Sequence, residues 1–179
     1  MKKFNHRNYT RAFIKIKPSK KIPGEVGAFS LRYFKRGSII IKAAEFEDNY
    51  LIPVNEYKKL NKNTKKMVND YCEITNDFAI VPRNINHIKN IHYMNHSCNP
   101  NVGFDSKDNY VAIKNIKEND EFLMCYSLLY TNKSFKMRCL CKSKNCRKII
   151  TGNDWKDTRL QKKYRDFFIS TIRRKLKNG

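Results

Sequence analysis

The sequence predicts a single, mostly β domain built from short strands, with helices inserted near residues 54–70 and placed after residue 153. A chain of 179 residues is long enough to bury one hydrophobic core. Its short apolar runs are bounded by Gly, Pro, Asn and Asp, which is typical of strands separated by turns. Only two segments show the spacing of apolar residues that an amphipathic helix requires.

The first strands are expected near the N-terminus. Residues 11–17 alternate loosely between apolar and polar side chains and lead into a turn at residues 18–23. Gly37 lies in a basic turn before the apolar residues 39–41, so short strands are expected on both sides of this glycine. Further strands are expected at residues 78–82, 110–113 and 121–126, with a turn at residues 115–120.

Helical spacing occurs in two segments. Residues 54–68 fit one amphipathic helix or two short ones, because residues 61–64 resemble a break. Residues 153–179 fit a helix for which Asn153 or Asp154 is the expected N-cap. The chain is therefore expected to end in one basic helix.

The charge of the chain is strongly positive. Lys and Arg number 38 against 16 Asp and Glu, and the formal net charge of +22 is spread along the whole length. Such a charge indicates attraction to nucleic acid or another polyanion, or else a lysine-rich solvated surface. No apolar stretch approaches the roughly 20 residues that span a bilayer, and the basic N-terminus lacks the apolar run of a secretory signal. We expect an intracellular protein, in the cytoplasm, the nucleus or a host cell, without a membrane partner.

Three of the six cysteines lie close together in the sequence, at Cys139, Cys141 and Cys146. Their spacing is too tight for separate disulfides and suits three thiolates on one zinc ion. Structural zinc requires a fourth ligand. The residues alone leave that ligand open among Cys72, Cys98, Cys125, His92 and His96.

Four sequence motifs together resemble those of the SET-domain protein lysine methyltransferases. Residues 95–101 read Asn-His-Ser-Cys-Asn-Pro-Asn, which matches the family's main motif without a gap. Residues 120–126 end in a Tyr, as the family's second motif does, and the cysteines of residues 139–146 resemble its post-SET zinc cluster. The Gly segment around residues 24–30 matches less well, because Glu25 stands where the family has its first Gly.

The resemblance covers roughly residues 22–150 and implies a particular fold. Several short curved sheets surround a threaded, pseudoknot-like segment that carries residues 95–101, a topology that pattern reading alone does not supply. It implies a SET domain at residues 1–130 with a helical insertion at about 54–70. A post-SET-like zinc-binding segment at residues 131–152 and the basic helix at 153–179 follow.

The resemblance also implies S-adenosylmethionine as the methyl donor. The side chain of Asn95 is expected to accept from the ammonium group of this cofactor, and the backbone of His96 to bind the adenine edge. The backbone around Glu25, Val26 and Gly27 is expected to hold the amino-acid end. Trp155, the single tryptophan, either packs on the adenine or anchors the C-terminal helix to the core.

Tyr126 is the expected catalytic residue, because a phenol at the end of a buried strand can orient the amine and interact with the polarised methyl group. It is also expected to contact the cofactor and to line the lysine channel together with Met124. By the same resemblance, Cys98 is the fourth zinc ligand. Cys72 and Cys125 then remain as buried thiols without a role.

The function implied is transfer of methyl groups to the side-chain amine of a lysine in another protein. A histone, or a ribosomal or other nucleic-acid-associated protein, is a candidate substrate because of the charge of the chain. The alternative is a catalytically inactive, zinc-stabilised SET-like module that binds nucleic acid. That alternative accounts for the charge and the cysteines but leaves Tyr126, Asn95 and His96 unexplained.

Overall fold

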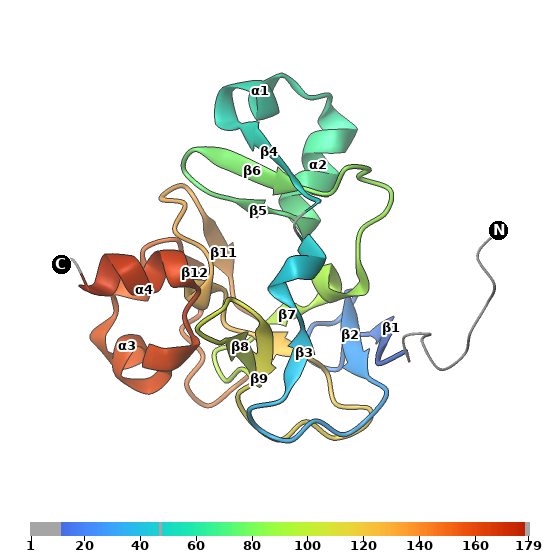
Figure 1. Ribbon diagram of the computed structural model, residues 1–179, viewed down its shortest axis with the longest axis vertical. Helices are drawn as coiled ribbons and strands as arrows, with labels where there is room; N and C mark the ends of the chain where they lie inside the picture. The colour runs from blue at the N-terminus through green and yellow to red at the C-terminus, as the bar shows by residue number, and fades with distance from the viewer. Residues whose placement is uncertain (1–11, 47, 178–179) are drawn as a thin grey trace.

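The structure, a computed structural model, describes residues 12–46 and 48–177 and consists of four small sheets with short helices (Figure 1). The five-stranded central sheet has the order β3-β9-β8-β10-β7. Its strands are β3 (Ile39–Ile41), β7 (Asn95–His96), β8 (Val102–Phe104), β9 (Tyr110–Ala112) and β10 (Leu123–Met124). The predicted mostly β fold is confirmed.

Strand β10 lies between two strands that precede it in the chain. It pairs in parallel with β7, where Leu123 is opposite Asn95, and with β8, where Met124 is opposite Val102. The Asn101 side chain completes the junction, because its amide donates to Glu121 O at 2.9 Å and accepts from Leu123 N at 2.8 Å. Residues 97–101 therefore cross past β10, as expected for a threaded segment.

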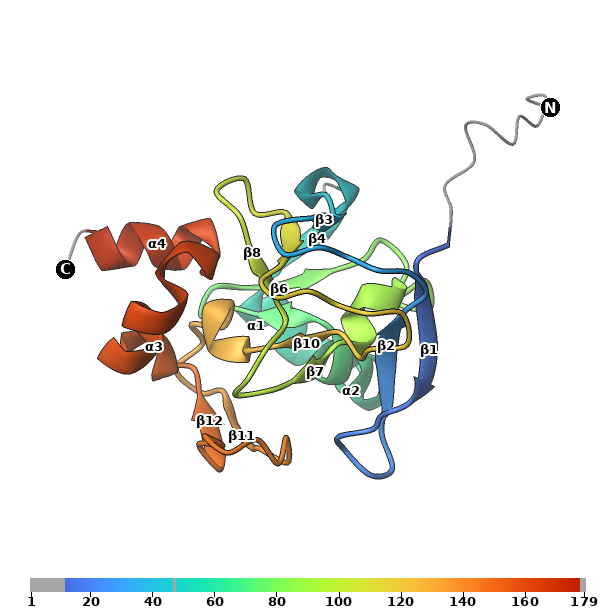
Figure 2. The same ribbon diagram turned by 90° about the horizontal axis from the view of Figure 1, so that it is seen from below.

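The N-terminal hairpin packs against this central sheet from one side (Figure 2). Strand β1 (Ile14–Pro18) pairs antiparallel with β2 (Val26–Ser30), with Ile16 opposite Ala28. Gly37 adopts a φ of +88° in the turn before β3, which a residue without a Cβ tolerates. The strand expected before Gly37 is reduced to one bridge between Phe34 and Ile116.

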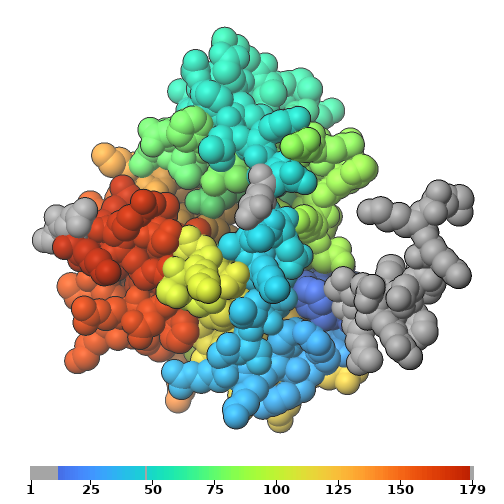
Figure 3. All heavy atoms as spheres, viewed as in Figure 1, coloured from blue at the N-terminus to red at the C-terminus, as the bar shows by residue number. Residues whose placement is uncertain are grey.

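The insertion forms a separate lobe at the top of Figures 1 and 3. It contains β4 (Tyr50–Pro53), α1 (Val54–Lys59), α2 (Lys62–Tyr71), β5 (Glu73–Ile74) and β6 (Phe78–Val81), with the sheet order β4-β6-β5. The Asn61 side chain accepts from Thr64 N at 2.9 Å and caps α2, so the predicted break produces two helices. Val68, Cys72, Ala79 and Val81 form the lobe's own small core.

The C-terminal segment forms two helices, α3 (Thr158–Tyr164) and α4 (Ser170–Lys177), where one was expected. Asp157 caps α3 by accepting from Arg159 N at 2.8 Å, so the helix begins later than Asn153 or Asp154. Between the helices, Ile169 N donates to Leu128 O at 2.9 Å. This bond to the central domain interrupts the helical pattern. Before α3, β11 (Lys136–Arg138) and β12 (Ile149–Thr151) form the cysteine-bearing hairpin.

One large core joins the central sheet to the C-terminal helices. Phe104, Phe122, Leu128, Phe168 and Ile172 are among its fully buried members. Within the described part of the chain, no helix is long and apolar enough to cross a membrane.

Candidate active site

Asn95 is held by two acceptors at the start of β7. Its Nδ2 donates to Val26 O at 2.8 Å and to Glu121 Oε1 at 3.0 Å. Because both partners accept, the orientation of the amide is set by its hydrogen bonds. Among the residues that the structure describes, none donates to Asn95 Oδ1, so this oxygen is available to a ligand with N–H groups.

Glu121 is the buried carboxylate that organises this corner. It is 6% exposed and also accepts from Ser19 Oγ at 2.8 Å and from Lys20 N at 3.2 Å. A Cβ on Gly27 would collide with Glu121 and would lie 3.1 Å from Asn95 Nδ2. The close approach of Glu121 therefore leaves no room for a side chain at residue 27. The backbone conformation does not itself require a glycine here, because the φ of Gly27 lies outside the left-handed region.

Glu25 and Val26 precede Gly27 at an exposed position beside this corner. Val26 is 40% exposed, and its carbonyl is already bonded to Asn95. Burial, with a smaller contribution from the negative charge of Glu25, raises the pKa of Tyr126 to about 12. Glu25, which stands where the family has its first Gly, thus adds negative charge near Tyr126.

His96 connects the backbone of Tyr126 to the cysteine cluster. Its Nδ1 accepts from Tyr126 N at 3.0 Å, and its Nε2 lies 3.5 Å from Cys98 Sγ. Burial lowers the pKa of His96 to about 3, with a smaller contribution from the Arg147 charge. The ring is therefore neutral, and the proton on Nε2 is directed to the sulfur.

Tyr126 follows β10 and begins a short 3₁₀ turn, Tyr126–Leu128. Its hydroxyl donates to Met94 O at 3.0 Å. Its ring packs edge-on against His96 and Tyr130, with centroid distances of 5.2 and 5.3 Å. With its raised pKa, the side chain is a neutral phenol at physiological pH.

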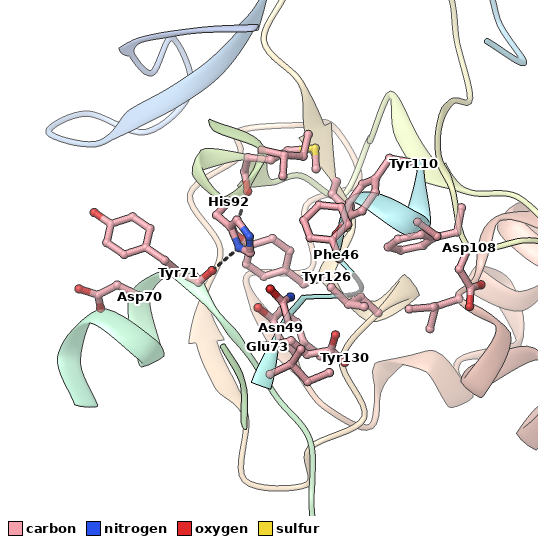
Figure 4. A pocket seen from close by; sticks show the side chains of 18 residues that line it. Phe46, Asn49, Asp70, Tyr71, Glu73, His92, Asp108, Tyr110, Tyr126 and Tyr130 are labelled. Carbon is pink, nitrogen blue, oxygen red and sulfur yellow. Dashed lines mark hydrogen bonds between the residues drawn. The ribbon is translucent and has the colours of Figure 1, made fainter. Parts of the chain in front are cut away.

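A cavity of about 240 Å³ extends from Tyr126 between the central sheet and the insertion lobe (Figure 4). Met124 and Tyr126 both line it, together with Tyr110 and Tyr130. Glu73, the first residue of β5, is a carboxylate in the same wall. The cavity therefore combines aromatic rings with one strand-borne acid.

Four of the five cysteines within residues 98–146 converge on one point. The sulfurs of Cys98, Cys139, Cys141 and Cys146 lie within 4.8 Å of one another, and Cys98 Sγ is 3.8 Å from Cys139 Sγ. Tetrahedral zinc with Zn–S bonds of about 2.3 Å would separate its sulfurs by about 3.8 Å. The cluster fits zinc in number, chemistry and spacing.

Hydrogen bonds to the sulfurs of Cys98 and Cys141 favour their thiolate forms. Arg147 N donates to Cys98 Sγ at 3.3 Å, and Cys98 N donates to Cys141 Sγ at 3.5 Å. Burial raises the pKa of Cys141, but the hydrogen bonds from Ser143 and from Cys98 N outweigh it and lower that pKa to about 6. Thiolates are the form that binds metal.

Among the residues that the structure describes, the other candidate zinc ligands lie outside the four-cysteine cluster. Cys72 is buried in the insertion lobe, and Cys125 is fully buried behind Tyr126. His92 Nδ1 donates to Tyr71 O at 2.7 Å. The expectation that Cys72 and Cys125 are buried thiols is confirmed.

Arg147 ties the cysteine cluster to the turn that carries Tyr126. Its guanidinium donates to Asp154 at 2.7 Å, to Ser127 Oγ at 3.0 Å and to Cys125 Sγ at 3.2 Å. The Arg147 and Asp154 side chains are 17% and 16% exposed, so this pair is shielded from solvent. Movement of the cluster would therefore displace the Tyr126 turn.

The comparisons with known proteins agree with these observations. The family model of the SET domain matches residues 25–127, and the chain belongs to this family. No curated protein matched the chain.

The structure brings the expected residues to two neighbouring places, joined by Tyr126. Asn95, Val26 and Gly27 meet around Glu121, while Met124 lines the cavity with Tyr126. Trp155 packs partly buried against the main core, which favours the anchoring role. Glu73, Glu121 and Arg147 were not expected as parts of the site, and the one available signal was the acidic position within residues 120–126.

Proposed function

We propose that this protein is an S-adenosylmethionine-dependent protein lysine N-methyltransferase. The observation that carries the proposal is that Tyr126 lines the aromatic cavity while its backbone N–H donates to His96, the residue that follows Asn95. We infer two binding surfaces at Tyr126, one with the amide oxygen of Asn95 and the other formed by the aromatic cavity. A methyl donor and an amine require such separate sites on opposite sides of the reacting methyl group.

The cofactor side is assigned to Asn95, His96 and the Glu25–Gly27 backbone. When bound, S-adenosylmethionine supplies a methyl group on a positively charged sulfonium. Asn95 Oδ1 accepts from the cofactor's ammonium, and the absence of a side chain at Gly27 leaves room beside Glu121. The negative charge of Glu25 favours a cationic ligand, since opposite charges attract at short range.

The lysine channel is assigned to Tyr126 and Met124. Displacement at a methyl group requires an uncharged amine in line with the breaking bond, and positioning can contribute about 7–11 kcal/mol of the barrier. The Tyr126 hydroxyl, fixed by Met94 O, orients the amine, while Met124 closes the wall without offering a hydrogen bond. Because Tyr126 is a neutral phenol, it adds no charge to the channel.

Zinc is assigned to Cys98, Cys139, Cys141 and Cys146. The metal would hold residues 131–152 against the motif at residues 95–101 and, through His96 and Arg147, would stabilise the Tyr126 turn. We assign residues 1–130 to the SET domain with its insertion, residues 131–152 to the zinc-binding segment and residues 153–179 to a basic C-terminal segment.

The substrate is a protein that carries the target lysine. Because the chain has a net charge of +22, we propose a substrate presented on nucleic acid, such as a histone or a ribosomal protein. A polyanion would offset the repulsion between two basic proteins.

Transfer of radiolabelled methyl groups to proteins tests this function. The zinc-loaded protein is incubated with labelled S-adenosylmethionine and a whole-cell extract that retains chromatin and ribosomes. We expect label on lysine side chains, with a yield that falls as salt rises because exposed charges are screened. Absence of label from every fraction, although the cofactor binds, would leave the inactive nucleic-acid-binding module as the better account.

A further inference from the structure

Glu73 is an acidic residue without a counter-ion in the wall of the Tyr126 cavity. The chain has 38 basic and only 16 acidic residues, so basic side chains that could pair with a carboxylate are in excess. Among the residues that the structure describes, none forms a salt bridge or a side-chain hydrogen bond with Glu73. A partly buried carboxylate in this state is costly unless a partner arrives from outside.

The other two carboxylates that line the cavity are already paired with cations. Asp70 pairs with Lys66 at 2.7 Å, and Asp108 pairs with Arg173 at 3.2 Å. Figure 4 shows Asp70 and Asp108 at opposite edges of the cavity and Glu73 near its centre. Glu73 is therefore the acid placed to meet a ligand inside the cavity.

The surroundings of Glu73 explain its electrostatic state. Burial, with a smaller contribution from the negative charge of Asp108, raises the pKa of its carboxyl group to about 8. Burial and, to a smaller extent, the negative charge of Glu73 both raise the pKa values of Tyr110 and Tyr130. An incoming cation would relieve this penalty and ionise Glu73, since opposite charge favours the charged form.

We propose that Glu73 binds the ammonium form in which the substrate lysine enters the Tyr126 cavity, before the amine loses its proton for methyl transfer, and so selects a cationic side chain. The inference rests on the proposed function, because that function makes the cavity a lysine channel. The aromatic rings of Tyr110, Tyr126 and Tyr130 supply the walls for the lysine's methylene chain. They also offer ring faces to its charge.

The pH dependence of binding follows from the groups that face the cavity. Burial lowers the pKa of His92, and burial raises the pKa values of the lining tyrosines, so none of these rings gains charge as the pH rises toward 8. Asp70 and Asp108 stay in their ion pairs. Glu73 is mostly protonated in the empty cavity below its pKa of about 8 and gains its charge as the pH rises through that value.

Titration of n-butylammonium, which stands in for the lysine side chain, tests the proposal by NMR. The zinc-loaded protein is saturated with S-adenosylhomocysteine, and binding is followed from about pH 6 to about pH 9, where the probe remains charged. The affinity of the unmutated protein is expected to rise with pH. Glu73→Gln keeps the size of the side chain and should bind about tenfold more weakly, without that pH dependence.

Asp70→Asn is the matched control, because Asp70 lines the same cavity but is paired with Lys66. It should bind the probe as the unmutated protein does. Equal binding by Glu73→Gln and the unmutated protein, or no binding by either, would overturn the role of Glu73. Cofactor binding measured on the same samples reports separately on the proposed function.

Discussion

Removal of zinc is expected to unfold the β11–β12 hairpin and to abolish methyl transfer. Structural zinc contributes on the order of 10 kcal/mol in small domains. Here the hairpin's local core contains Cys98, Cys139, Cys141 and Ile150, so most of its buried residues would be metal ligands. The main core around the central sheet is separate and should remain folded. Calorimetry before and after chelation should show loss of one transition.

A pair of cysteine variants separates the effect of losing the metal from the effect of disturbing the packing. Cys141→Ser removes a ligand and should reproduce the effect of chelation. Cys72→Ser alters a buried thiol of the insertion lobe and should retain zinc and activity, with only a modest loss of stability. Zinc content below one ion per chain in the unmutated protein, or equal behaviour of the two variants, would contradict the assignment.

Tyr126→Phe is expected to lower the rate of methyl transfer by about 10²–10³-fold, a loss comparable to that of one positioned hydrogen-bonding group at a reacting centre. The substitution removes the hydroxyl that donates to Met94 O and keeps the ring packed against His96. The affinity for the cofactor should therefore change little, because the contacts of Asn95 and His96 remain. Single-turnover kinetics with labelled cofactor measure this split between rate and binding.

Tyr130→Phe provides the control for that experiment. Tyr130 lines the same cavity, and its ring packs against both Tyr126 and Phe135. If the hydroxyl at residue 126 has a specific role, Tyr130→Phe should retain most of the activity. Equal losses in the two variants would indicate that general polarity of the cavity matters, and that Tyr126 has no special role.

The parts of the site that could be predicted are short strings in which residue type determines chemistry. Residues 95–101 and the cysteines of residues 139–146 indicate their roles without knowledge of distant contacts. The fourth ligand was open on the residues alone. The resemblance suggested Cys98, and the structure confirms a four-cysteine cluster that includes it.

Other features depend on contacts between distant segments. Strands β4 and β5 contain Pro53 and Glu73, which have low strand propensity, and they form because β6 pairs with both. The interruption between α3 and α4 depends on the bond from Ile169 N to Leu128 O. Helical periodicity alone could not reveal it.

The sequence offered no reason to single out the charged residues of the site, because charged residues are frequent throughout the chain. In a chain with 30% charged residues, Glu73 and Arg147 resemble ordinary surface positions. Their burial follows from tertiary packing, which places Arg147 beside Asp154 and brings Glu73, on the edge strand β5 of the insertion lobe's sheet, into the wall of the cavity. Glu121 belonged to a recognised motif, but its hydrogen bonds to Ser19 and Asn95 span about one hundred and about twenty-six residues of chain.

Isothermal titration of S-adenosylmethionine into the zinc-loaded protein tests the central claim most directly. We expect saturable binding at one site, retained in Tyr126→Phe and weakened about tenfold or more in Asn95→Ala, which removes the acceptor that we assign to the cofactor's ammonium. Binding that is unaffected by Asn95→Ala would contradict the assigned cofactor site. Absence of binding by the unmutated, folded protein would contradict the methyltransferase function itself.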